Sequence, residues 1–136
     1  MKGENKLFAA IHAPGIAASG IPRHFSPHVE SLDPHTVLLD ISGMERLFGE
    51  PYSIAQAIRS QAGPQANVAI ARNPNAAVCA ARGYAGIVVI PRGEEAARLG
   101  GLPLDLLEMA PEVLEVLHRW GLVTFRDLAA LPESGL

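Results

Sequence analysis

Two aspartates near the middle of the sequence have side chains of a type that could bind a metal ion. Asp33 and Asp40 lie seven residues apart in a segment that reads as extended backbone. An odd separation places two side chains on opposite faces of a strand, so these carboxylates are poorly placed to share a cation. Both stand beside turn residues, Pro34 and the Ser42–Gly43 pair, where short acidic side chains usually accept backbone hydrogen bonds. We therefore predict capping and turn roles for Asp33 and Asp40.

The histidines offer one spacing that is typical of metal ligands. His24 and His28 are four residues apart, which would suit two ligands on one face of a helix. Pro27 lies between them and we expect no helix there, so we predict no metal site from this pair. The single Cys79 has no ligand-like partner nearby and reads as a buried free thiol. We expect no metal ion or other cofactor, and no catalytic residue.

A third group of residues, towards the C-terminal end, could contact the phosphates of DNA. Gly121 and Thr124 fall in a predicted hairpin between two helices, and the amides of such a hairpin can hold a phosphate without reading bases. Arg119 and Arg126 would add positive charge beside it. The same residues would also serve as helix caps and a solvated face, and Asp127 weakens the local positive field. Both interpretations stay open for this group.

Alternating strands and helices must position these residues. Short apolar runs bounded by Gly or Pro predict strands at 7–11, 37–41, 67–71 and 86–90. Apolar residues at helical spacing predict helices at 53–62, 74–83 and 94–99, because these segments begin near Pro, Ser or Asn and end at Gly. Residues 15–22 read as a connector and residues 25–36 as a loop. This order predicts an α/β fold in which helices 53–62 and 74–83 pack mainly against one face of a sheet.

The last third of the chain has a different pattern. Pro111 fits the first turn of a helix with apolar residues at 113, 114, 117 and 120, and Gly121 fits the left-handed residue that ends it. Thr124 and Asp127 are spaced as in a capping box, and the helix that follows reads through Leu131 to Pro132. The pattern predicts a small helix-hairpin-helix-like module.

Composition excludes several classes of protein. The 136 residues are 49% hydrophobic and 18% charged, which is enough apolar material for a folded core. The net charge is −3, whereas proteins that bind nucleic acid strongly on their own usually carry a basic excess. No signal peptide and no run long enough to cross a bilayer are visible. We expect a cytoplasmic protein without membrane contact, whose binding to DNA is weak and non-specific.

The segment at residues 25–49, FSPHVESLDPHTVLLDISGMERLFG, resembles the central palm segment of the Y-family (UmuC/DinB-like) DNA polymerases. In that family an SPxVE…LD…G…LFG frame surrounds a pair of metal-binding acids. The acids lie five and four residues before the aspartate that corresponds to Asp40, and those positions here are His35 and Thr36. Further segments that resemble the family in the same order are VAIARNPNAAVCAARG at 68–83, GIVVIP at 86–91, LGGLPLDLL at 99–107 and LHRWGLVTFRDLAALP at 117–132.

The resemblance implies a ferredoxin-like palm-type sheet, including the strand near 7–12, followed by a thumb module. It is closest to the non-catalytic ImuB-like branch, whose members keep the frame and lack the polymerase acids. Two-metal nucleotidyl transfer needs clustered carboxylates, so the degenerate metal-site positions His35 and Thr36 predict a protein that is not an enzyme. The resemblance also implies partners: the sliding clamp, an error-prone polymerase subunit and a recombinase-like companion, bound through regions outside residues 1–136.

The chain also departs from the family pattern. Residues 15–24 stand where the family has the rest of its first palm unit and its fingers, and no aspartate occurs in 7–14 to match the family's first-strand acid. The two family lysines of the 68–83 segment fall on Pro74 and Val78, and we expect no little finger, since the sequence stops at Leu136.

The sequence therefore predicts three segments and one leading function. The segments are an N-terminal strand and connector (1–24), a palm-like α/β domain (25–101) and a helix-hairpin-helix-like thumb (102–136). The leading hypothesis is an adaptor or scaffold in translesion synthesis and DNA repair. The alternatives are a fragment of a catalytic Y-family nucleotidyltransferase, and a structural fragment without retained activity.

Overall fold

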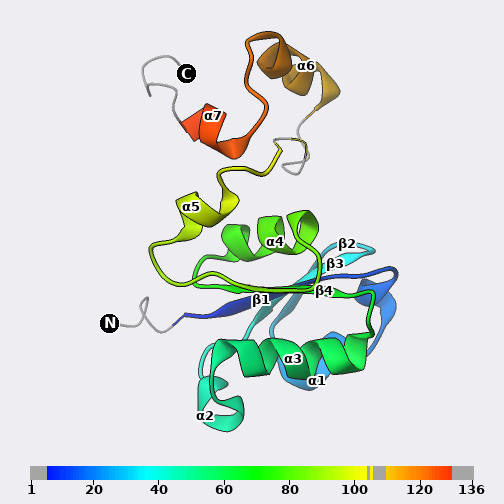
Figure 1. The fold of residues 1–136 in the computed structure, drawn as a ribbon. Helices are drawn as coiled ribbons and strands as arrows, with labels where there is room; N and C mark the ends of the chain where they lie inside the picture. The colour runs from blue at the N-terminus through cyan, green and yellow to red at the C-terminus, as the bar shows by residue number, and fades with distance from the viewer. Residues whose placement is uncertain (1–5, 104, 106–109, 130–136) are drawn as a thin grey trace. The chain divides into compact units, whose positions relative to one another are not determined.

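The computed structural model describes residues 6–103, 105 and 110–129, and it contains two compact units, Met1–Arg92 and Gly93–Leu136 (Figure 1). The sequence-based division into 1–24, 25–101 and 102–136 stays a prediction about domains. In the structure the first strand is part of the first unit, because it lies in the middle of that unit's sheet. No helix of the described residues is long and apolar enough to cross a membrane.

The first unit is built on a five-stranded mixed sheet with the order β2-β3-β1-β4-β5. The strands are β1 (Phe8–His12), β2 (Val29–Asp33), β3 (Thr36–Asp40), β4 (Asn67–Ala71) and β5 (Ile87–Val89). β1 is antiparallel to both of its neighbours, β3 and β4, whereas β4 and β5 are parallel. The predictions that residues 37–41, 67–71 and 86–90 share one sheet, and that the strand near 7–12 joins it, are confirmed.

One face of the sheet carries the main hydrophobic core. Alternate residues of the central strands, such as Ala9, Leu39 and Ile70, are fully buried there, because successive side chains of a strand point to opposite faces. Ile54 and Ile58 of α3 (Pro51–Ala62) complete this core. The short helix α2 (Glu45–Phe48) precedes α3.

The opposite face is covered by α4 (Pro74–Gly83), so the prediction that both helices pack on one face is wrong (Figure 1). Ala10 and Ala69 point to this second face, and the buried alanines of α4 pack over β1 and β4. Because small residues occur on both partners, the helix can approach the sheet closely. Asn73 caps α4 as predicted, since its Oδ1 accepts a hydrogen bond from the Ala76 amide at 3.1 Å.

The segment between β1 and β3 contains more regular structure than the sequence predicted. A 3₁₀ helix η2 (Ile16–Ala18) and α1 (Ile21–Phe25) occupy the expected connector, and β2 occupies the expected loop. β2 carries only Val29 and Leu32 as apolar residues, so its hydrophobic pattern is weak. It forms a strand because β3 offers it a pairing partner across the turn at Pro34 and His35.

The second unit contains α5 (Glu95–Leu99), α6 (Pro111–Arg119) and α7 (Phe125–Ala129). α6 ends as predicted: the Leu122 amide donates to the Leu117 carbonyl and the Gly121 amide to the His118 carbonyl, with Gly121 at φ +84°. The capping box is also confirmed, since Asp127 Oδ2 accepts from the Thr124 amide at 3.0 Å and Thr124 Oγ1 from the Asp127 amide at 3.2 Å. The predicted helix end at Leu131 and Pro132 lies outside the described residues.

Candidate functional site

His35 lies in the turn between β2 and β3, at the first of the two positions where the Y-family frame has metal-binding acids. Its backbone amide donates to Asp33 Oδ1 at 2.7 Å, and its Nδ1 accepts a hydrogen bond from the Gly15 amide at 2.9 Å. The Ala13 amide donates to the His35 carbonyl at 2.9 Å. The imidazole therefore stabilises the turn that follows β1, because its Nδ1 lone pair accepts the hydrogen bond of the Gly15 amide.

Thr36 occupies the second position, at the start of β3, and it is fully buried. Its Oγ1 is 2.9 Å from His12 Nδ1. The sheet brings these two residues together, since Thr36 is the partner of His12 in the β1–β3 register. A hydroxyl paired with an imidazole satisfies a buried polar group and supplies no negative charge.

Asp33 provides a carboxylate close to these positions, and Arg82 of α4 neutralises it. Arg82 Nη2 and Asp33 Oδ2 are 2.8 Å apart, with 13% and 29% of the two side chains exposed. Partial burial on its own would raise the pKa of Asp33, but hydrogen bonds from the His35 amide, Arg82 and Thr36 together hold the pKa below its ordinary value of 3.8. The carboxylate is thus ionised and already engaged.

Asp40 lies at the other end of β3. Asp33 pairs with Thr36, and four residues of strand at about 3.3 Å each separate Thr36 from Asp40, so the two aspartates are roughly 13 Å apart. Asp40 Oδ1 accepts from the Ser42 amide at 3.0 Å, as Asp33 does from the amide two residues after it. Burial would raise the pKa of Asp40. The hydrogen bonds from Ser42 and the charge of Lys6, 3.7 Å away, outweigh this effect, so the pKa of Asp40 is below its ordinary value. The predicted turn roles of both aspartates are confirmed.

These residues do not fit the paired Mg²⁺ ions that the Y-family frame implies. Among the described residues, no three His, Cys, Asp or Glu side chains gather closely enough to hold a metal ion. Mg²⁺ takes carboxylates and water in octahedral geometry, whereas this end of the sheet offers two imidazoles, a hydroxyl and one carboxylate bound to a guanidinium. Sequence reasoning missed Arg82, although it is the one charged residue within the Pro74–Gly83 helix.

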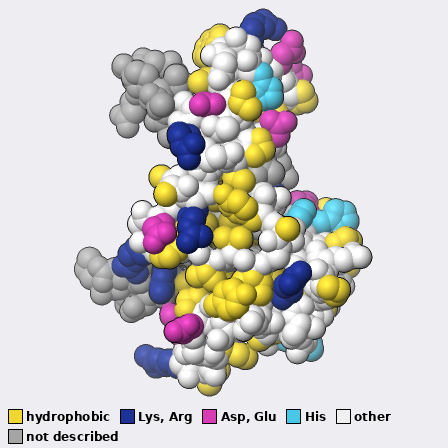
Figure 2. Space-filling model, in the orientation of Figure 1, with side chains coloured by type: hydrophobic (Ala, Val, Ile, Leu, Met, Phe, Trp, Pro, Cys, Tyr) yellow, Lys and Arg dark blue, Asp and Glu magenta, His cyan; other side chains and the backbone are white. Residues whose placement is uncertain are grey.

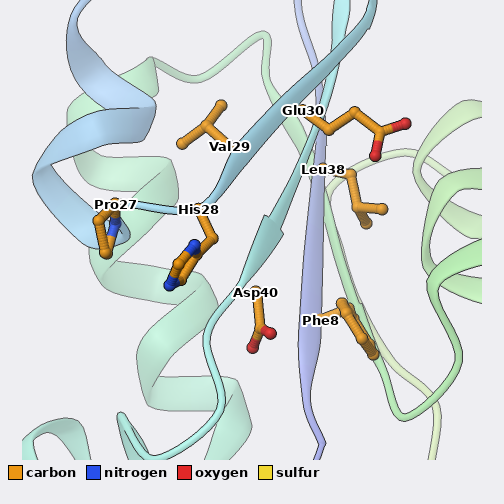
Figure 3. Close-up of a pocket in the computed structure, with 7 residues that line it drawn as sticks. All are labelled: Phe8, Pro27, His28, Val29, Glu30, Leu38 and Asp40. Atoms are coloured by element: carbon orange, nitrogen blue, oxygen red, sulfur yellow. The ribbon is translucent and has the colours of Figure 1, made fainter.

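A hollow of about 390 Å³ lies at the free edge of the sheet, where β2 begins (Figure 3). Figure 3 shows Val29 and Glu30 pointing to opposite sides of β2, with Leu38 and Phe8 on the same side as Glu30. The residues that line the hollow are Phe8, Pro27, His28, Val29, Glu30, Leu38 and Asp40. Its lining is mixed: four of these residues are apolar, Glu30 and Asp40 are acidic, and His28 contributes an imidazole.

In the second unit, the amides of the predicted hairpin site are already occupied. The amides of Val123 and Thr124 both donate to Asp127 Oδ2 at 3.0 Å. The Phe125 and Arg126 amides donate to the carbonyls of Leu102 and Gly100 at 3.0 and 2.9 Å. The hydrogen bonds from the Val123 and Thr124 amides hold the pKa of Asp127 below its ordinary value. A phosphate would have to displace this carboxylate to reach the amides.

The side chains near that hairpin are also partly paired. Arg119 bonds Glu115 at 3.0 Å one turn back along α6, and His118 Nε2 is 3.4 Å from Asp105. Arg126 is exposed, and Trp120 is 66% exposed. Figure 2 shows the Lys and Arg side chains of this face scattered among acidic ones rather than gathered into one basic surface. Contact between DNA phosphate and Arg119, Gly121, Thr124 and Arg126 stays a prediction.

Comparison with known proteins relates this chain to polymerases. No family model matches the sequence. Over 129 residues the chain is 31% identical to a protein of Mesorhizobium japonicum named DNA polymerase IV 2, and the aligned region covers 90% of this chain and 31% of that protein. A solved structure described as a Dbh ternary complex with partially disordered substrates superposes with a TM-score of 0.58 at 18% identity, covering 81% of this chain and 35% of the other.

The two comparisons agree with the sequence frame at 25–49. The structural match shows that most of this chain shares the fold of part of that protein, and the sequence match relates the chain to a protein named DNA polymerase IV 2. The chain is thus a Y-family DNA polymerase-like protein that spans about a third of the length of the polymerase it matches.

Proposed function

We propose that this chain is a non-catalytic Y-family-like protein of the ImuB-like kind, which acts as an adaptor or scaffold in translesion synthesis and DNA repair. The observation that carries the proposal is the bonding of the two residues at the metal-site positions. Thr36 is buried against His12, and the His35 ring accepts the Gly15 amide. Both side chains have structural partners, and neither contributes a carboxylate.

The electrostatics of the neighbouring residues support the same conclusion. A two-metal site concentrates negative charge so that divalent cations bind and orient the attacking and leaving oxygens. Here the nearest carboxylate, Asp33, forms an ion pair with Arg82 at 2.8 Å. A cation at this position would have to compete with a guanidinium that α4 holds in place.

The adaptor role would be carried by surfaces rather than by chemistry. In this proposal the second unit corresponds to the thumb and gives weak, non-specific contact with DNA through Arg119 and Arg126. The sliding clamp, an error-prone polymerase subunit and a recombinase-like companion are the partners that an ImuB-like protein would bind, through regions outside residues 1–136.

A second candidate function is a fragment of a catalytic Y-family nucleotidyltransferase. The similarity to a protein named DNA polymerase IV 2 favours it. The absence of acids at His35 and Thr36 opposes it, since the nucleotidyl transfer of that family depends on them. A structural fragment without retained activity is the remaining alternative, and it differs from the adaptor in binding neither DNA nor protein partners.

Primer extension tests the proposal. The purified chain is incubated with a primed template, nucleotides and Mg²⁺ or Mn²⁺, beside a Y-family polymerase as positive control. We expect no template-dependent incorporation above a sample without protein. The double variant His35→Asp, Thr36→Glu should stay inactive, because the first-strand acid is also missing. Incorporation by the parent chain, abolished by changes at Asp33 or Asp40, would instead support the nucleotidyltransferase.

A further inference from the structure

We propose that the free edge of β2 and the hollow beside it bind an extended peptide segment of a partner protein, which adds a strand to the sheet and places a lysine or arginine side chain in the hollow. The site is independent of the metal-site positions and of the hairpin in the second unit. Strand addition of this kind uses backbone hydrogen bonds for affinity and a side-chain pocket for selection.

The hydrogen-bond register shows that the outer edge of β2 is available. β2 ends the strand order, and β3 is the one element of the described chain against which it packs extensively. The Asp40 amide donates to the His28 carbonyl at 3.1 Å, so His28 belongs to a bonded pair. Bonded and non-bonded pairs alternate along an antiparallel ladder. The N–H and C=O groups of Val29 and Ser31 therefore point away from β3.

A hydrogen bond on the other side of β3 gives the same assignment of inward and outward backbone groups. The Ile41 amide donates to the Leu7 carbonyl at 2.9 Å on the β1 side of β3. Ile41, and with it Leu39, thus directs backbone groups toward β1, which leaves Asp40 and Leu38 for β2. The register shift between Ser31 and Asp33 interrupts the edge, because a bulge disrupts the ladder locally. The free edge is limited to residues 29–31, directly beside the hollow.

The residues that line the hollow favour a long, positively charged side chain on the added strand. Leu38, on the neighbouring strand β3, can pack against the methylene groups of a long side chain, as apolar residues often do with lysine and arginine stems, and Phe8 of β1 lines the inner side of the hollow. The exposed carboxylate of Glu30 stands on the same side of β2 and can pair with the charged head. Asp40 adds a second negative group, which Lys6, at 3.7 Å with half its side chain exposed, and the His28 imidazole in the same lining offset in part.

Charge also argues against a second copy of this chain as the occupant. An antiparallel pairing of two copies through the free edge at residues 29–31 would bring Glu30 of one strand opposite Glu30 of the other. Like charges that face each other across a sheet are destabilising. A partner strand with a basic residue avoids this repulsion.

Peptide titration of the full chain tests the site. The probe is an acetylated and amidated heptapeptide of alternating threonine and valine with a central arginine, and binding is followed by NMR through the amide signals of residues 29–31. We expect saturable shifts there with a Kd no weaker than about 1 mM. The same peptide with central glutamate should bind less tightly. A version with N-methylated backbone amides should not bind.

Two protein variants separate the edge from the hollow. Ser31→Pro removes an outward N–H that no strand of this sheet uses, and proline is tolerated on edge strands, so the fold should persist while binding is lost. Glu30→Gln should raise the Kd of the arginine peptide about threefold, and it should not raise the Kd of the glutamate peptide. Glu50→Gln, which removes one exposed carboxylate elsewhere in the unit, is the matched control and should change neither.

Several outcomes would overturn the inference. They are the absence of saturable shifts at residues 29–31, equal binding by folded Ser31→Pro, and equal effects of Glu30→Gln and Glu50→Gln. Shifts at these amides that depend on protein concentration without peptide would identify a second copy as the occupant instead.

Discussion

Replacement of Asp33 by asparagine tests whether the ion pair with Arg82 holds the end of the sheet together. The variant Asp33→Asn keeps an oxygen that can accept the His35 amide, which now lies 2.7 Å from Oδ1. It removes the negative charge that faces Arg82 at 2.8 Å. The change therefore isolates the charged part of the interaction between α4 and the β2–β3 turn.

The expected loss of stability follows from the burial of the pair. A hydrogen bond to a charged group contributes about 1.5–3 kcal/mol, and breaking a fully buried pair costs more. Arg82 is 13% exposed but Asp33 is 29% exposed, so solvent screens part of the interaction. We expect Asp33→Asn to lower the free energy of unfolding by about 2 kcal/mol near neutral pH.

The effect should depend on pH in a defined direction. The pKa of Asp33 in the folded protein is below its ordinary value of 3.8. A depressed carboxyl pKa contributes stability that is fully present above the unfolded value and is lost as pH falls through the folded one. The difference between the parent chain and Asp33→Asn should therefore be constant above pH 3.8 and shrink in more acidic solution.

Urea denaturation followed through the NMR signals of β1 and β3 would measure this difference in the first unit alone. Asp40→Asn is the matched control, because Asp40 makes the same kind of turn but its cation, Lys6, is 3.7 Å away and 53% exposed. That control should cost no more than about 1 kcal/mol. Equal losses for the two variants, or a loss for Asp33→Asn that does not change with pH, would refute the role assigned to the pair.

The other predictions concern the second unit. Asp127→Ala should speed hydrogen exchange at the Val123 and Thr124 amides, which now donate to the Asp127 carboxylate, and it should leave exchange in β1 unchanged. Unchanged exchange at these two amides would show that the capping box is not formed in solution. Any DNA affinity should be weak, with a slope of log K against log salt of roughly −2, and Arg119→Ala with Arg126→Ala should bring the slope toward zero equally on all sequences. Fluorescence anisotropy with duplex oligonucleotides would measure both, and tight binding at physiological salt or an unaffected double variant would contradict the prediction.

Local patterns in the sequence predicted the parts of the fold that local chemistry decides. The apolar run at 37–41 and the β-branched run at 86–90 form strands, and the Asn73 and Thr124 caps lie where helices begin. β2 was missed because its residues carry little apolar pattern of their own, and its partner β3 determines its conformation. Strand identity of this kind is a tertiary effect.

The faces covered by the helices, and the contacts of the site, could not be predicted from local pattern. The helix at 74–83 is alanine-rich over most of its surface, so periodicity does not say which face of the sheet it covers. The contact of His12 with Thr36 depends on the register of β1 against β3, and the contact of Arg82 with Asp33 depends on which face α4 occupies. The resemblance singled out His35 and Thr36 as degenerate metal-site positions, whereas their places in the β2–β3 turn and at the start of β3, and their hydrogen bonds, required the structure.

A titration with Mn²⁺, followed by NMR, would decide whether the end of the sheet has lost its metal site. The paramagnetic ion broadens the signals of nearby amides, so a bound ion reveals its position without any need for catalysis. We expect no saturable, selective broadening at His12, Asp33, His35 and Thr36, since Arg82 already neutralises the one carboxylate there. Selective broadening at these residues that saturates below about 1 mM Mn²⁺ would contradict the loss of the site and favour the nucleotidyltransferase over the adaptor.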